Sequence, residues 1–238
     1  MNSLQSLSII LLAALIHASF QLSVSVLTLI SGHSLSAKYS HKRTLSLSSS
    51  FILGVILMIF LLLSSLSWII MQFFQGVVPE YVWAVVCGML LGLAIAVWLF
   101  YYRREKGTSL WIPRDFAEYL TNRTKATKTI AEAFGLGLSS VLGEILFIIG
   151  PLLITTLVLT KLSNNMQIVG VLIYTLVSTM PLLIVWLLVD GGYSLSKIQK
   201  WREKNKYFLQ FIAGLGLIIA SFFIYANEIV GNFSRMIL

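Results

Sequence analysis

The sequence contains very little cysteine and little charge. Among its 238 residues Cys87 is the one cysteine, and Asp, Glu, Lys and Arg together make up 11%. One cysteine cannot form a disulfide within the chain, and there is neither a Cys-x-x-Cys pair nor a Cys/His cluster with the spacing of metal ligands. Thiol redox chemistry and structural zinc are therefore disfavoured, and we predict no metal site and no cofactor.

The usual catalytic motifs are also missing. The sequence has no His-Glu-x-x-His, no Gly-x-Ser-x-Gly, no paired aspartates in its apolar segments and no nucleotide-binding loop. An intramembrane enzyme would have to use Ser139 or Ser140 as nucleophile and His17 as base, and serines are frequent in this chain. We therefore do not predict an enzyme.

Hydrophobic residues, in contrast, make up 58% of the chain, and the mean hydropathy is +0.89. These values exclude a soluble fold and predict an all-α, polytopic membrane protein. Six segments have about the 20 residues that a spanning helix needs, or more. They cover approximately 8–30, 50–74, 81–102, 132–160, 168–189 and 207–226. Residues 1–7 carry no Lys or Arg, so no cleavable signal peptide is predicted.

The basic residues predict the topology. Of the 17 Lys and Arg residues, three lie between the first and second spans, seven between the third and fourth, and five between the fifth and sixth, which leaves Lys161 and Arg235. By the positive-inside rule the three basic loops are cytoplasmic and both termini are outside. We predict a multi-pass protein of a bacterial plasma (inner) membrane. The net charge of +8 then reflects topology, and no nucleic-acid partner is expected.

This topology divides a single transmembrane domain, residues 1–238, into two halves. Residues 1–102 form a first three-helix half, 103–128 a cytoplasmic basic loop and 129–238 a second three-helix half. Because the first half begins outside and the second begins inside, the halves would have opposite orientations. Such an inverted three-plus-three repeat is a common transporter plan, with the site near the membrane midplane.

Glu144 is the main candidate for a functional residue. Counted from Gly135 at 1.5 Å per residue, Glu144 lies about 13 Å along its helix, near the middle of a hydrocarbon layer about 30 Å thick. An acidic residue at this depth costs roughly 3 kcal/mol and is normally kept where it faces protein, water or a transported species. The Gly150-Pro151 pair that follows is expected to interrupt the helix and to free backbone carbonyls. A purely structural carboxyl, protonated and bonded to Gln21 or Ser140, is the alternative.

Further polar residues in the spans complete the predicted site. Four of them recur at helical spacing in the first span, so that they share one face: His17, Gln21, Ser25 and Thr28. In the fifth span, Tyr174 and Ser178 are expected to turn toward the bundle, and Pro181 to bend the helix. The predicted substrate or ion site is thus Glu144, His17, Gln21, Ser25, Ser140, Pro151, Tyr174 and Ser178.

Small residues predict close helix contacts. A stripe of Gly135, Ser139 and Gly143 would bring the fourth span against the first, whereas Gly88 and Gly92 in the third span fit either an intrachain contact or a homodimer. The loop 103–128 is expected to contain a short helix with Pro113 in its first turn. That helix would rest on the inner leaflet, in contact with membrane lipids, or would dock a membrane-protein or cytoplasmic partner.

The chain resembles the lysine-exporter and cytochrome-c-biogenesis (LysE/CcdA-like) superfamily of small bacterial membrane proteins. The resemblance lies in six spans in two halves, small and polar residues in the first and fourth spans, a basic loop after the first span, and a last segment Asn205-Lys-x-x-x-Gln210-x-x-Ala-Gly214-x-x-Leu-Ile. It implies export of a small polar solute, a metal ion or a lipid-linked species, or electron transfer in the thiol-carrying branch. The paired membrane cysteines of that branch are absent, and so is the first-span proline of several exporter branches.

Two functions follow from the sequence. The first is a transporter or exporter that holds a small solute, an ion or a lipid-linked species between the first and fourth spans, with Glu144 as the proton-coupling or cation-binding group. The second is a non-catalytic membrane scaffold or subunit that binds other membrane proteins.

Overall fold

The computed structural model describes residues 2–20, 22–36, 41–75, 77–101, 114–191, 193 and 195–231. Every regular element in this part of the chain is helical, which confirms the all-α prediction. In chain order the elements are α1 (Ser3–Ser19), α2 (Leu22–Ser36), α3 (His41–Phe74), α4 (Glu80–Phe100), α5 (Arg114–Ala126), α6 (Ile130–Leu159), α7 (Asn164–Asp190), α8 (Leu195–Ile224) and the π-helical turn η1 (Tyr225–Val230).

Five of the described helices are long and apolar enough to cross a membrane: α3, α4, α6, α7 and the continuous α8–η1 segment. The polytopic character predicted from hydropathy is therefore confirmed. The predicted first span, 8–30, is not one helix but the pair α1 and α2, which meet at an angle of 45°. The count of six spans holds only if this broken pair crosses the membrane as one unit.

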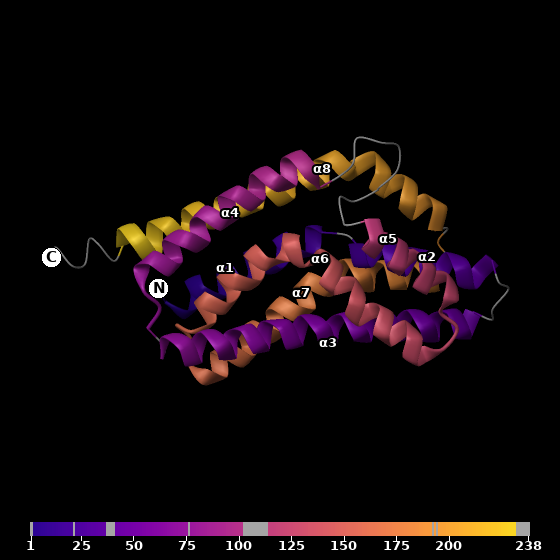
Figure 1. Cartoon of the computed structure of the whole chain (residues 1–238), viewed down its shortest axis with the longest axis horizontal. Coiled ribbons are helices and arrows are strands. Elements are labelled where there is room, and N and C mark those ends of the chain that lie inside the picture. The colour runs from indigo at the N-terminus through magenta and orange to yellow at the C-terminus, as the bar shows by residue number, and fades with distance from the viewer. Residues whose placement is uncertain are drawn as a thin grey trace.

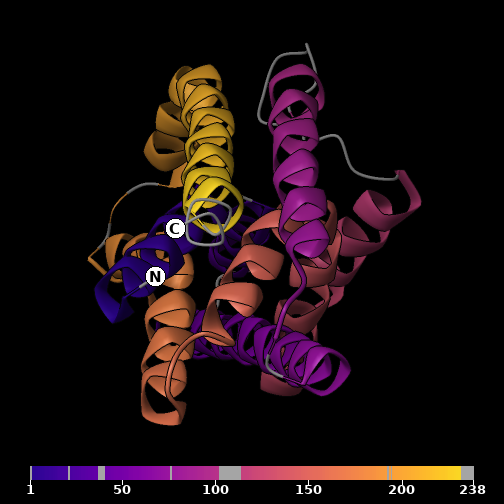
Figure 2. The same cartoon turned by 90° about the vertical axis from the view of Figure 1, so that its left-hand side faces the viewer.

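The spanning helices form a bundle in which α4 and α8 lie side by side on one flank and α3 lies on the opposite flank, with α1 and α6 between them (Figures 1 and 2). The start of α1, in indigo, and the end of the α8–η1 segment, in yellow, are at the same end of the bundle (Figure 1). At the other end the predicted basic loops converge. There the Arg43 guanidinium donates to the Lys128 carbonyl oxygen at 3.2 Å, and His41 pairs with Asp190 at 3.1 Å. Which face of the membrane this end meets stays a prediction.

Helices α3 and α6 contact each other backbone to backbone at Gly54 and Gly137. A Cβ atom added to Gly137 would lie 3.1 Å from the Cα of Gly54 and closer still to the carbonyl oxygen of Phe51. The fourth span does pack against the first, as predicted, through contacts of α6 with α1 and α2. Gly135 and Ser139 do not make this contact, since among the described residues a Cβ at Gly135 meets nothing within 4 Å and Ser139 bonds back to its own helix. Gly137 is two positions further on, about 200° around the helix, and therefore faces α3 rather than α1.

Helix α6 is capped at its start and runs through its proline. Thr129 and Glu132 form a reciprocal capping box, and the Glu132 carboxylate also accepts from the Lys128 backbone N–H at 2.7 Å. Glu132 thus has the structural role expected of a carboxylate at a helix start.

The predicted interruption at Gly150-Pro151 does not occur, since α6 continues to Leu159. Beside the proline, Leu90 and Leu93 of α4 pack onto Gly150.

Two further features hold the bundle at its ends. The short helix predicted in the basic loop is α5, whose Leu120 is buried where α5 packs against α2 and α6; Pro113 lies outside the described residues. At the opposite end the Lys161 ammonium pairs with the buried Glu228 carboxylate of η1 and lies 4.7 Å from the centre of the Trp83 ring. This contact joins α4, the α6–α7 connection and η1.

Candidate functional site

The first span breaks beside the centre of the bundle. Helix α1 ends at Ser19, Phe20 is extended with φ −79° and ψ 141°, and α2 begins at Leu22. The Phe20 N–H closes the end of α1 by donating to the His17 carbonyl oxygen at 3.0 Å. The Phe20 ring is held by Tyr101 and Phe147, with ring centres 5.2 and 5.8 Å away. The predicted continuous helix is therefore interrupted by packing against α4 and α6.

Glu144 lies where the break exposes the start of α2. It is 14 residues from the first residue of α6 and 15 from the last, halfway along the helix, and its depth near the middle of the membrane stays a prediction. Its side chain is 5% exposed, and its Oε1 accepts from the Ser23 backbone N–H at 2.5 Å. Gln21, which the sequence analysis paired with Glu144, lies outside the described residues. The observed partner, Ser23, was not predicted.

This hydrogen bond has a clear physical reason. The first four N–H groups of any helix lack an intrahelical acceptor, and the helix dipole makes that end positive. Within a membrane no water replaces the missing acceptor, so the protein must supply one. The Glu144 carboxylate does so from another helix, and it thereby caps α2.

Most of the remaining predicted site residues gather around this cap. A small chamber of about 10 Å³ is bounded by His17, Ser23, Glu144 and Ser178, together with apolar side chains. The Ser23 hydroxyl lies 3.2 Å from the Ser140 hydroxyl. Such a chamber has room for about one water molecule.

A second polar pair links α1 to α7 at the same site. His17 Nδ1 and the Tyr174 hydroxyl are 2.9 Å apart, and both side chains are buried. The structure thus brings together five of the eight predicted residues: Glu144, His17, Ser140, Tyr174 and Ser178.

Ser25 and Pro151 lie elsewhere. The Ser25 hydroxyl accepts from the Arg202 guanidinium at 2.8 Å, in the first turns of α8, and does not line the chamber. Ser25 lies away from the chamber because the first span bends between α1 and α2. In a straight helix the polar residues of this span would share one face. Pro151 is seven residues beyond Glu144, about 10 Å along α6, in the part that packs on α4.

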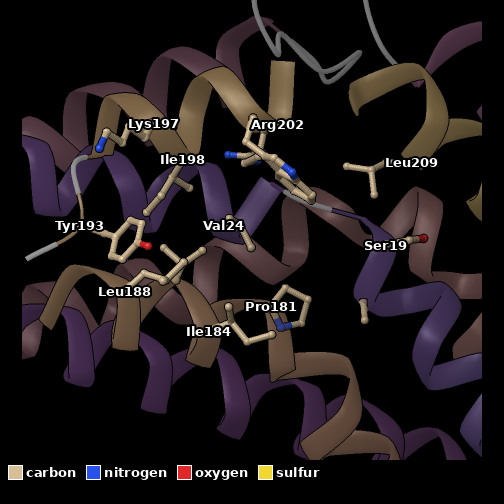
Figure 3. A pocket seen from close by; sticks show the side chains of 13 residues that line it. Ser19, Val24, Pro181, Ile184, Leu188, Tyr193, Lys197, Ile198, Arg202 and Leu209 are labelled. Carbon is tan, nitrogen blue, oxygen red and sulfur yellow. The ribbon is translucent and has the colours of Figure 1, made fainter. Parts of the chain in front are cut away.

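On the other side of the break lies a groove of about 630 Å³, between α7, α8 and the α1–α2 junction (Figure 3). We call it the α7–α8 groove. Its lining is Ala18, Ser19, Val24, Pro181, Ile184, Val185, Leu188, Tyr193, Lys197, Ile198, Trp201, Arg202 and Leu209. Val24 and Pro181 also line the chamber, so these two side chains form the wall between the groove and Glu144.

Two functional candidates were missed by the sequence analysis, Ser23 and Arg202. Ser23 belongs to the polar stretch Gln21-Leu-Ser-Val-Ser25, but nothing in that stretch marks a helix start. Arg202 was counted as a loop cation, although its side chain is 4% exposed and reaches α2. No signal in the sequence marks it, because its neighbours on the same face of α8 include Gln199, Asn205 and Lys206.

Comparison with models of protein families, with curated proteins and with solved structures finds no match to this chain. The resemblance to the LysE/CcdA-like superfamily therefore stays a prediction.

Proposed function

We propose that this chain is a membrane carrier whose translocation site lies at the α1–α2 break, between that break and α6. The observation that carries the proposal is the helix start exposed beside a buried carboxylate halfway along α6. Discontinuous membrane helices whose ends meet at the midplane are the way in which many carriers bind their substrates and coupling ions.

In this proposal the α1–α2 junction changes its conformation during transport and does not only connect two helices. Irregular backbone at membrane depth is tolerated where it is buried in protein or lines a cavity, and here it does both. The chamber lies on one side of the junction and the α7–α8 groove on the other, with Val24 and Pro181 between them. Displacement of these two side chains would connect Glu144 to a space large enough for a small substrate.

Glu144 supplies the coupling in this proposal. As a carboxylate it accepts from Ser23 and neutralises the positive start of α2. When it takes up a proton or a cation, that attraction weakens, so α2 is released to reorient against α1. The carboxylate thereby couples ion loading to the geometry of the break, and the substrate site opens or closes with it.

The lining of the groove favours one of the three predicted substrate classes. Its wall is built mostly of Val, Leu, Ile, Pro and Trp side chains, which offer little to a free ion or a polar solute. A lipid-linked or otherwise amphiphilic species would bury its apolar part there.

Cysteine labelling tests the carrier proposal without a known substrate. In a Cys87→Ala background, we expect Ser23→Cys to react with a membrane-impermeant thiosulfonate added to either side of oriented vesicles, because alternating access exposes the break to both. Ala13→Cys is the matched control, since Ala13 is fully buried in α1. Reaction of Ser23→Cys from neither side or from only one side, or no faster than that of Ala13→Cys, would contradict a carrier.

A membrane scaffold is the second candidate, and one observation favours it. A Cβ atom added to Gly88 or Gly92 of α4 meets nothing within 4 Å, and both residues are exposed. Within the described residues this stripe is not used for packing, although such stripes let helices approach closely. It offers a surface for a second membrane helix, from another copy or another protein.

A further inference from the structure

The α7–α8 groove combines an apolar wall with a basic edge. The described residues that line it include Lys197 and Arg202 and no carboxylate. Both cations come from the first turns of α8, at the end of the bundle where the basic loops converge. Figure 3 shows their nitrogen atoms on the α8 side of the groove, with the apolar side chains of α7 facing them.

Arg202 is held in position rather than extended into solvent. Its guanidinium donates to the Ser25 hydroxyl at 2.8 Å, and its side chain is 4% exposed. A guanidinium has five N–H donors in a planar fork, which is the geometry that suits phosphate oxygens. Lys197 is exposed, lies five residues before Arg202 in α8 and also lines the groove, so it adds a second positive charge to the same edge.

Aromatic side chains mark the same edge as a membrane interface. Tyr193 and Trp201 line the groove beside the two cations and are 59% and 58% exposed. Such rings prefer the headgroup level of a bilayer. We therefore expect the charged edge to lie nearer the headgroups than the apolar wall, which reaches Ala18 and Leu209.

We propose that the α7–α8 groove binds an anionic phospholipid, with its phosphate at Arg202 and Lys197 and an acyl chain along Ile184 and Leu188. This deepens the proposed function by naming its substrate class, and as a statement about transport it rests on that function. The charge of the edge selects an anionic over a zwitterionic headgroup. The length of the apolar wall selects a lipid over free phosphate, which would leave most of the groove unused.

Native mass spectrometry of the full chain tests the proposal. The protein is purified in micelles that contain equal amounts of dioleoylphosphatidylglycerol and dioleoylphosphatidylcholine. We expect the wild type to retain the anionic lipid preferentially, and Lys197→Gln to reduce that preference about fivefold, the effect of one basic residue near an anionic surface. Lys200→Gln is the matched control, because Lys200 lies on the same helix but not in the groove. Equal retention of the two lipids, or equal loss in both variants, would overturn the proposal.

Ile184→Trp tests the apolar wall with both cations intact. The larger side chain narrows the groove where the acyl chain is proposed to lie, so retention of the anionic lipid should fall while the thermal unfolding temperature of the protein is kept. Unchanged retention would overturn the proposal, as would displacement of the lipid by inorganic phosphate, which would indicate a phosphate site. Selective retention without two-sided labelling of Ser23→Cys would leave the lipid site standing and remove the carrier. The reverse result would remove the lipid site alone.

Discussion

The α3–α6 contact and the α1–α2 junction are built in opposite ways. At the first, Gly54 and Gly137 let two unbroken helices touch backbone to backbone, and no side chain separates them. At the second, the first span is divided into α1 and α2, and the Glu144 carboxyl group of α6 accepts a hydrogen bond from the start of α2. Cavities lie on both sides of this junction. Helix α6 takes part in both, with Gly137 and Glu144 seven residues apart.

The difference indicates which part of the bundle is fixed. Close backbone packing has no spare volume, so it resists displacement. A helix start held by one carboxylate and flanked by cavities has fewer contacts to lose. We infer that α3 and α6 form the frame against which α1 and α2 move.

Gly137→Leu should damage the frame most. The leucine side chain would have to enter the backbone of α3 at Phe51, which cannot rotate away, so the free energy of unfolding should fall by about 3 kcal/mol. Denaturant titration in detergent micelles measures the change. Gly135→Leu is the control, because a Cβ at Gly135 meets nothing within 4 Å. If both variants are equally stable, the α3–α6 contact is not the fixed part.

Glu144 variants should weaken the junction by a smaller amount. Glu144→Leu removes the acceptor and leaves the Ser23 N–H buried without it, which costs about 1 to 3 kcal/mol. Glu144→Gln keeps an oxygen at the same place but removes the charge that attracts the start of α2, so it should lose about 1 kcal/mol, less than Glu144→Leu. The same titration compares the two. Equal losses would show that the charge, and not the cap, stabilises α2.

The comparison also explains what the sequence could predict. Span length and hydropathy locate α3, α4, α6, α7 and α8, because each depends on a local run of apolar residues. The place of Glu144 halfway along α6 also follows from counting residues, whereas its depth in the membrane stays a prediction. The spans depend on neighbouring residues only, and the helices predicted from them are confirmed.

The break between α1 and α2 could not be predicted in this way. Residues 8–30 contain neither glycine nor proline, so no local signal interrupts them. The acceptor that caps α2 is Glu144, 121 positions from Ser23, and the rings that hold Phe20 come from α4 and α6. Conversely, Pro151 carries a strong local signal for a break that the packing of α6 overrides.

Tyr174→Phe should loosen the junction slightly. It removes the hydroxyl that pairs with His17 Nδ1, while the ring remains in place, so the expected loss is about 1 kcal/mol. Tyr207→Phe is the control on an exposed ring. Thermal unfolding of the two variants gives the difference. If Tyr174→Phe behaves as the control does, the polar pair is not part of what holds α1 to α7.

Substitution on the outer face of α4 should leave both regions unchanged and alter only association. Gly92→Leu adds a side chain where the described residues leave open space, so the unfolding free energy of the monomer should stay within about 0.5 kcal/mol of the wild type. If a second helix packs there, the variant should shift the oligomer toward monomer in nanodiscs, measured by single-molecule photobleaching of a labelled chain. Gly135→Leu, which is also open but on α6, should leave the oligomer as it is. An unchanged distribution for Gly92→Leu would place any partner elsewhere, and the case for a scaffold would lose the observation that supports it.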